Sequence, residues 1–148
     1  MNIESLDKAL LEIVQKRNEL KDIDYEDLKY DSVEEELHQM EDDFVENYGE
    51  DLEKVLQKIH DELCPETDVL LPIAYVAQKY IPTGTKEDGT EGYDVTMQEG
   101  VPVILEEYPD HPSRIVLVPN PPRLILQVAV DQRFQVWPES DVKSEPEQ

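Results

Sequence analysis

A glutamate and a histidine lie three positions apart in the segment SVEEELHQMEDDFVE, residues 32–46, as Glu35 and His38. Helix bundles use this Glu-x-x-His spacing to hold iron or manganese, because side chains three residues apart project from the same side of a helix. Such a site also needs a second copy of the motif and two further carboxylates from other helices. The chain supplies one motif, on a short helical region, so the sequence does not assemble this centre.

The direction in which the motif points follows from the apolar residues around it. They recur at three- and four-residue steps and define the inward face: Val33, Leu37, Met40 and Phe44. At 100° per residue, His38 lies about 130° from the centre of that face, and Glu35 and Asp42 lie farther round. We therefore expect the motif to belong to a solvated helix face. The sequence predicts no metal ion and no cofactor.

A second candidate for metal binding is the pair His60 and Cys64, which lie one helical turn apart. A structural zinc ion takes four ligands, usually cysteine and histidine, whereas the neighbours of this pair are Asp61, Glu62 and Asp68. We expect instead a partly buried cysteine and a boundary histidine near a helix end, where the helix dipole favours histidine.

The acidic run also fails the test for a calcium loop. An EF-hand loop needs oxygen ligands at positions 1, 3, 5, 9 and 12 and a glycine at position 6. Counted from Asp22, position 6 is Asp27 and position 12 is Val33. The run DGTEGYD, residues 88–94, has acids and glycines without a repeated ligand frame, and a hairpin loop explains it.

Signals for nucleophilic catalysis are weak. The chain contains no Gly-x-Ser-x-Gly elbow and no phosphate-binding glycine-rich loop ahead of a helix. His111 lies between two prolines and two residues before Ser113, and a rigid turn accounts for it. We keep one enzymatic alternative open, a metal-dependent or hydrolytic enzyme whose carboxylates and histidine meet near the mouth of the sheet.

Net charge narrows the classes of partner. The 148 residues include 13 Lys and Arg against 36 Asp and Glu, which gives −23. Nucleic acid is not an expected partner, because clustered cations bind phosphate backbones. The acids are also concentrated, since residues 22–53 contain 15 acids and a single base, Lys29. This distribution favours a basic protein as the partner.

Membrane and compartment signals are few. No apolar run approaches the roughly 20 residues that cross a bilayer, and Glu4 and Asp7 stand where a secretory signal would be basic. We expect no membrane partner. A single cysteine allows no internal disulfide, which suits a cytoplasmic protein.

The first half of the chain has helical periodicity. One amphipathic helix is expected at about 3–21, and a second begins at Ser32, which forms a capping-box pattern with Glu35. A later apolar stripe, on Leu52, Val55, Leu56, Ile59 and Leu63, is rotated by about 90° from the first. We expect a break at Tyr48–Gly49; a strongly curved single helix is the alternative.

The second half has short β-rich runs separated by proline and glycine, which is typical of strands and turns. We expect strands near 101–107, 114–118, 123–130 and 133–137, joined by links too short for parallel crossovers. Residues 72–80 fit a helix or a strand, and we favour the strand. Residues 83–100 should form a long mobile loop.

These elements predict an α+β fold with two or three N-terminal helices packed on a four- to five-stranded antiparallel sheet, a meander. Residues 1–138 should form a single domain, with a helical part at 1–66 and a β part at 67–138. The acidic tail, residues 139–148, should be disordered. In IVLV and LIL, residues 115–118 and 124–126, both strand faces are apolar, so either other segments of the chain or a second copy in a homodimer must cover them.

The favoured function is a non-enzymatic, partner-binding module that presents an acidic helical face to a basic surface. The residues expected to carry this contact are Glu35, His38, Asp42, Asp43 and Glu46. Their like charges stand close together on one helix, and a basic partner would relieve their repulsion.

Overall fold

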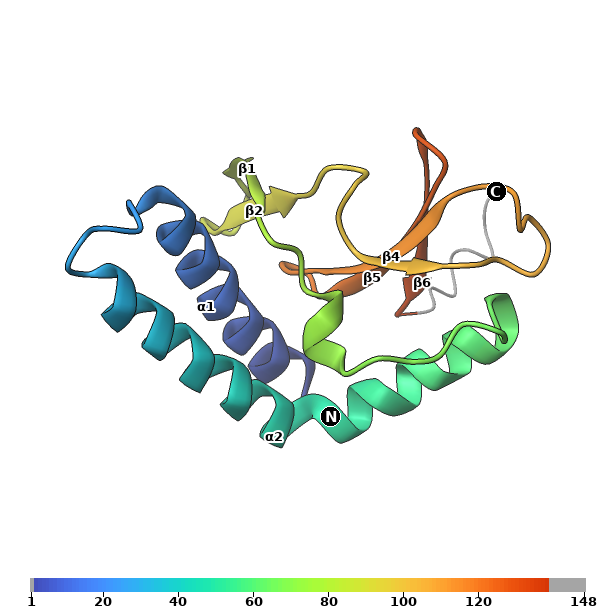
Figure 1. The fold of residues 1–148 in the computed structure, drawn as a ribbon, viewed down its shortest axis with the longest axis horizontal. Helices are drawn as coiled ribbons and strands as arrows, with labels where there is room; N and C mark the ends of the chain where they lie inside the picture. Colours follow the sequence, from blue (N-terminus) through green and yellow to red (C-terminus); the bar gives the residue numbers. More distant parts are fainter. Residues whose placement is uncertain (1, 139–148) are drawn as a thin grey trace.

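The computed structural model describes residues 2–138, which form an α+β fold with two N-terminal helices packed against antiparallel sheets (Figure 1). The elements are α1 Ile3–Asp22, α2 Tyr30–Leu63, a 3-10 helix η1 Pro72–Tyr75, and the strands β1 Ile81–Thr85, β2 Glu91–Asp94, β3 Val101–Val103, β4 Ser113–Val118, β5 Arg123–Val128 and β6 Gln132–Trp137. The predicted fold class is confirmed. The tail predicted to be disordered, residues 139–148, lies outside the described residues.

The expected break at Tyr48–Gly49 is wrong, because α2 runs through both residues without interruption. The two apolar stripes are nevertheless real, and the helix changes direction along its length, so that one half lies beside α1 and the other lies beneath the sheet (Figure 1). Each apolar stripe therefore packs on a different element, the first on α1 and the second on the sheet, so the rotation between the two stripes requires no loop. Gly49 lies between the stripes and is itself buried.

The start of α2 also differs from the capping-box prediction. The helix begins at Tyr30, two residues before Ser32, and its N-cap residue Lys29 makes no side-chain cap. The carboxylate of Asp27 accepts a hydrogen bond from the Lys29 backbone N–H at 2.8 Å and so orders the turn that enters the helix. This hydrogen bond belongs to the turn before the helix and does not cap its first N–H groups.

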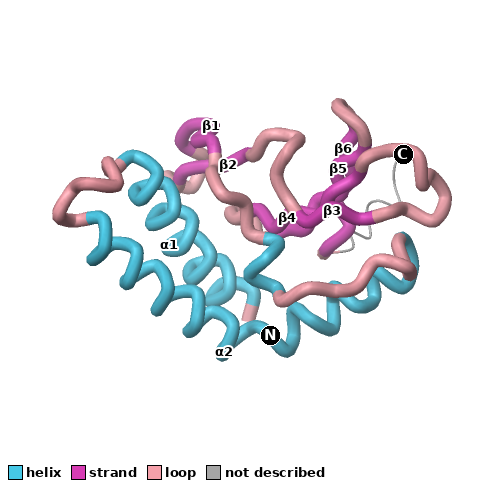
Figure 2. The backbone as a smooth tube through the Cα atoms, viewed as in Figure 1, coloured by secondary structure: helices cyan, strands magenta, loops and turns pink. Residues whose placement is uncertain are grey.

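The predicted meander is present as a four-stranded antiparallel sheet in the order β3-β4-β5-β6 (Figure 2). Its central pair, β4 and β5, is in register from Ser113 opposite Val128 to Val118 opposite Arg123. The short PNPP link joins them through Asn120, whose φ of 59° fits a tight turn.

The two apolar central strands were predicted to be buried on both faces by the same chain or by a second copy, and segments of the same chain bury them. Val116 is 0% exposed and Ile125 is 9% exposed. The segment 72–80 covers β4, because the Tyr80 hydroxyl donates to the Leu117 carbonyl at 2.6 Å. Within the sheet, the chain entering β3 approaches β4 so closely that a Cβ on Gly100 would lie 2.7 Å from the Ile115 carbonyl oxygen.

Two predictions for the region between the helices and the sheet are wrong. Residues 72–80 are not a strand, because Pro72–Tyr75 forms η1 and only Val76 makes a β-bridge, with Leu117. Residues 83–100 are not one loop, since β1 and β2 pair as a separate antiparallel hairpin. The rest of that segment is fixed by Gln127, whose amide nitrogen donates to the carbonyls of Thr96 and Glu99.

Candidate functional site

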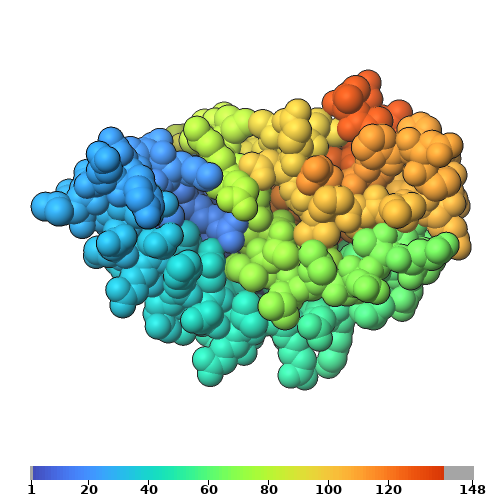
Figure 3. All heavy atoms as spheres, viewed as in Figure 1, coloured from blue at the N-terminus to red at the C-terminus, as the bar shows by residue number. Residues whose placement is uncertain are grey.

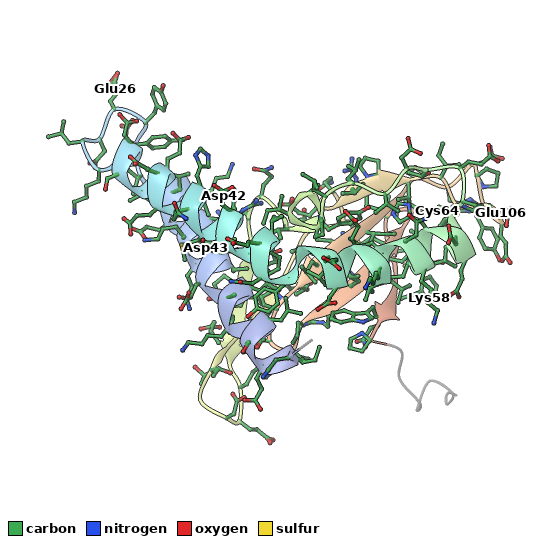
Figure 4. The ribbon with its side chains drawn as sticks, turned by 90° about the horizontal axis from the view of Figure 1, so that it is seen from below. Glu26, Asp42, Asp43, Lys58, Cys64 and Glu106 are labelled. Carbon is green, nitrogen blue, oxygen red and sulfur yellow. The ribbon has the colours of Figure 1, made fainter. Side chains whose placement is uncertain are left out.

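The five predicted partner-binding residues lie on the half of α2 that packs beside α1. Their side chains are all exposed: Glu35, His38, Asp42, Asp43 and Glu46. Figure 4 places Asp42 and Asp43 on this part of the helix, away from the sheet, with Glu26 on the loop that precedes it. We call residues 22–46 the acidic arm.

The charges of the acidic arm are only partly compensated. Among residues 2–138, no Lys or Arg lies within 4.0 Å of the carboxylates of Glu35, Asp42, Asp43 or Glu46. Asp43 accepts a hydrogen bond from the Gln39 side-chain amide at 3.1 Å, which leaves its charge in place. The surface of the arm is therefore a field of negative charge on a rigid helical support.

One carboxylate of the same helix has a different environment, because it faces α1. Arg17 on α1 donates from Nη2 to Glu41 at 2.8 Å, and both side chains are mostly buried. The same guanidinium donates from Nη1 to the carbonyls of Val76 and Ala77 at 3.1 and 2.8 Å. Arg17 thus joins α1, α2 and the segment that follows η1, so the acidic arm is held to the rest of the fold.

The pair His60 and Cys64 is more deeply buried than the sequence indicated, at 1% and 0% exposure. His60 Nδ1 lies 2.8 Å from the Thr67 carbonyl oxygen and Nε2 lies 2.9 Å from the Tyr75 hydroxyl. Since a carbonyl only accepts, the network assigns the hydrogen to Nδ1, and Nε2 accepts from Tyr75. Both ring nitrogens are occupied by protein groups. Burial raises the pKa of the Cys64 thiol to about 11.

Metal-ligating residues are not gathered elsewhere in the described part of the chain. No group of three or more His, Cys, Asp and Glu side chains is arranged to hold a metal ion within residues 2–138. In particular, Glu35 and His38 do not meet a third such residue there.

A groove near the end of α2 brings together residues that the sequence left separate. It has a volume of about 390 Å³ and is lined by Glu62, Leu63, Leu105, Glu107, Tyr108, His111, Leu126, Val128, Gln132 and Phe134. His111 thus shares a cavity with two carboxylates, as the enzymatic alternative requires. Ser113 does not complete it, because its hydroxyl donates to the His111 backbone carbonyl at 2.9 Å and not to the imidazole.

Sequence reasoning missed this groove because its walls come from three distant segments: the end of α2, residues 105–111, and the strands β5 and β6. One signal was available in hindsight. Phe134 is a large aromatic residue flanked by polar neighbours and Tyr108 follows two glutamates, and both stay half-exposed, at 51% and 55%. We call this cavity the α2–β6 groove.

Comparisons with known proteins assign no function to these surfaces. No family model, no curated protein and no solved structure matches the chain. No helix within residues 2–138 has the length and apolar character needed to cross a membrane.

Proposed function

We propose that the protein is a non-enzymatic binding module whose acidic arm docks on a basic surface of a partner protein. The observation that carries this proposal is the set of exposed carboxylates on α2 that no Lys or Arg of residues 2–138 pairs. Asp42 and Glu46 lie four residues apart on a continuous helix, so their charges repel by about 0.2–0.5 kcal/mol. A cationic partner converts this repulsion into attraction.

The rigidity of the arm supports the same proposal. Arg17 and Asn18 attach α1 to the segment 76–80, and the Asn18 amide exchanges two hydrogen bonds with the Tyr80 backbone at 3.0 and 3.1 Å. The charged surface is therefore presented in one orientation, which reduces the entropy that a partner must remove on binding. A cytoplasmic setting belongs to the proposal, because the lone cysteine is kept as a buried thiol.

Site-specific photocrosslinking tests the proposal directly. A benzophenone amino acid at the exposed position 38 should crosslink basic proteins from native lysate at low salt, and the yield should fall steeply as salt rises. The matched control carries the same probe at Ile104, which is 60% exposed and lies outside the arm. Equal crosslinking of the same proteins from both positions would overturn the proposal.

The enzymatic alternative has one observation in its favour, that His111, Glu62 and Glu107 all line the α2–β6 groove, although they are not arranged to hold a metal ion. A hydrolytic or metal-dependent site there predicts that Zn²⁺ or Mn²⁺ raises the melting temperature and that His111→Ala removes the increase. The binding proposal predicts no difference between the wild type and this variant. Most of the groove lining is apolar, which suits a bound side chain better than a hydrated ion.

A further inference from the structure

The α2–β6 groove lies at the end of the molecule opposite the tip of the acidic arm. Figure 3 shows the arm at one end of the long axis and residues of the β3–β4 loop at the other. A second cavity continues the groove along β6 and is lined by Val55, Lys58, Ile59, Glu62, Leu63, Gln135, Val136 and Trp137. The two cavities adjoin, because Glu62 and Leu63 line both, and we call the pair the trough between α2 and β6.

The strand beside this trough is the open edge of the sheet. β6 pairs with β5 on one side, and no other strand of residues 2–138 pairs with its outer side. Edge strands are usually protected by short length, proline or charged side chains. The opposite edge strand, β3, follows that rule, since it has three residues and contains Pro102. β6 has six residues and no proline.

The one charge on β6 does not protect its edge either. Arg133 is directed across the sheet, where its guanidinium donates to the Gln127 side chain at 2.8 Å and pairs with Asp94 at 2.9 Å. On the other face of the strand, Gln132 and Phe134 line the groove. A half-exposed aromatic ring beside an unpaired backbone edge provides both parts of a strand-addition site, a hydrogen-bonding ladder and a pocket for a side chain.

The charge of the groove indicates which kind of partner segment would bind beside β6. The α2–β6 groove is lined by two carboxylates, Glu62 and Glu107, and by no Lys or Arg, whereas the adjoining cavity is lined by one base, Lys58. A second copy of this chain would bring another net charge of −23 against the first. An extended peptide with an apolar and a basic residue two positions apart matches the groove and its carboxylates, because residues i and i+2 of a strand face the same side.

We propose that β6 accepts an extended segment of a partner protein as an added strand, with an apolar side chain of that segment seated beside Phe134 and Tyr108 and a basic one near Glu62 and Glu107. This goes beyond the acidic-arm function, since it assigns a second surface with a different mode of recognition. Backbone hydrogen bonds provide the register, and the groove provides the sequence preference.

Selection from phage-displayed random peptides of about 12 residues, long enough to span β6, tests the proposal. Enriched peptides should carry an apolar and a basic residue two positions apart, so that both side chains face the groove. In fluorescence anisotropy, N-methylation of every second backbone amide should weaken binding at least about tenfold in one register and leave it unchanged in the other, because only one edge of an added strand pairs. Phe134→Asp should weaken binding by a similar factor, and the control Ile104→Asp should not.

Each contrary outcome overturns the proposal. In the first, the selection enriches no peptides beyond those enriched by an unrelated protein. In the second, peptides with either N-methylation pattern bind as well as the unmodified peptide. In the third, the peptide binds Phe134→Asp as tightly as the wild type. Tyr108→Asp, on a different segment, repeats the test where Phe134→Asp unfolds. A wild-type dimer in light scattering that becomes a monomer in these variants would make the occupant a second copy. Neutralising the acidic arm should leave peptide binding intact, which separates this proposal from the arm's function.

Discussion

The two halves of α2 place the same kinds of side chain in opposite environments. His38 on the first half is exposed, whereas His60 on the second half is 1% exposed and bonded at both ring nitrogens. Most acids on the first half face water, whereas Glu41 pairs with Arg17, Glu36 pairs with Lys16 and Glu34 is partly buried. The difference teaches that one continuous helix treats its polar side chains in two ways, because both halves bury apolar residues but only the second half also buries a hydrogen-bonded histidine.

This separation has an energetic basis. A buried polar group stabilises a fold only when it is hydrogen-bonded, so the second half has little freedom to change. Exposed like charges contribute little or weakly destabilise, so the first half is free to be shaped by a partner. Substitutions of matched residues on the two halves should therefore differ in their effect on the free energy of unfolding.

The histidines give the largest expected contrast. His60→Leu leaves the Thr67 carbonyl without its partner and disturbs Tyr75, and should lower the free energy of unfolding by about 2–3 kcal/mol. His38→Leu should change it by less than about 0.5 kcal/mol, as is usual for surface positions. Urea unfolding followed by circular dichroism measures both. Equal losses in the two variants would mean that the halves are not distinct.

The glutamates give the next contrast. Glu41→Gln removes the charged partner of Arg17 while keeping the shape, and should destabilise by about 1–2 kcal/mol, since both side chains are mostly buried. Glu35→Gln, on the exposed face of the same helix, should be neutral within about 0.5 kcal/mol. High salt should reduce neither result greatly, because the Arg17–Glu41 pair is shielded from solvent. If Glu41→Gln behaves as Glu35→Gln does, Arg17 does not hold the arm.

The cysteine beyond the C-terminal end of α2 makes the buried half sensitive to alkali. Burial raises the pKa of Cys64 to about 11, whereas the thiol has 9.0 as its ordinary value. The folded state therefore keeps its proton where the unfolded state has lost it, so this contribution is intact below pH 9 and declines as pH rises towards 11. At pH 10 the loss is about 1.4 kcal/mol.

The free energy of unfolding, measured at pH 8 and pH 10 in the wild type and in Cys64→Ala, isolates the contribution of the Cys64 thiol. The drop between the two pH values should be smaller in the variant. An identical drop in both proteins would show that the thiol is accessible to solvent in the folded state.

The smallest effect is expected from neutralising the arm. The combination of Glu35→Gln, Asp42→Asn, Asp43→Asn and Glu46→Gln removes i,i+3 and i,i+4 repulsions worth about 0.2–0.5 kcal/mol per pair. Stability should stay equal or rise by up to about 1 kcal/mol at low salt, and the gain should vanish at high salt. A loss of stability would show that these charges support the fold.

Periodicity was enough to predict the helices and the meander, because apolar side chains repeat with the period of the element that buries them. It failed where tertiary neighbours decide. At Tyr48–Gly49 the change of stripe signified a change of packing partner along one helix. At residues 72–80 the backbone is fixed by Arg17 and Asn18, which lie about 60 positions earlier.

The candidate sites also divide into features that a local sequence pattern predicts and features that depend on contacts between distant elements. The outward direction of Glu35 and His38 followed from a local angle on one helix, which a sequence contains. The network of His60, Thr67 and Tyr75 and the α2–β6 groove each depend on contacts between elements, which a sequence does not contain. His60 was therefore misjudged as a boundary residue, and Phe134 was not singled out.

Affinity capture with the arm-neutralised protein tests the central claim most directly, provided that its folding is measured in the same preparation. The control neutralises four exposed acids elsewhere, Glu53→Gln, Glu66→Gln, Asp68→Asn and Glu87→Gln, so that both variants have the same net charge. The account predicts that the arm variant is as stable as the wild type and loses its basic partner, while the control retains it. Retention of the partner by both variants would contradict the account.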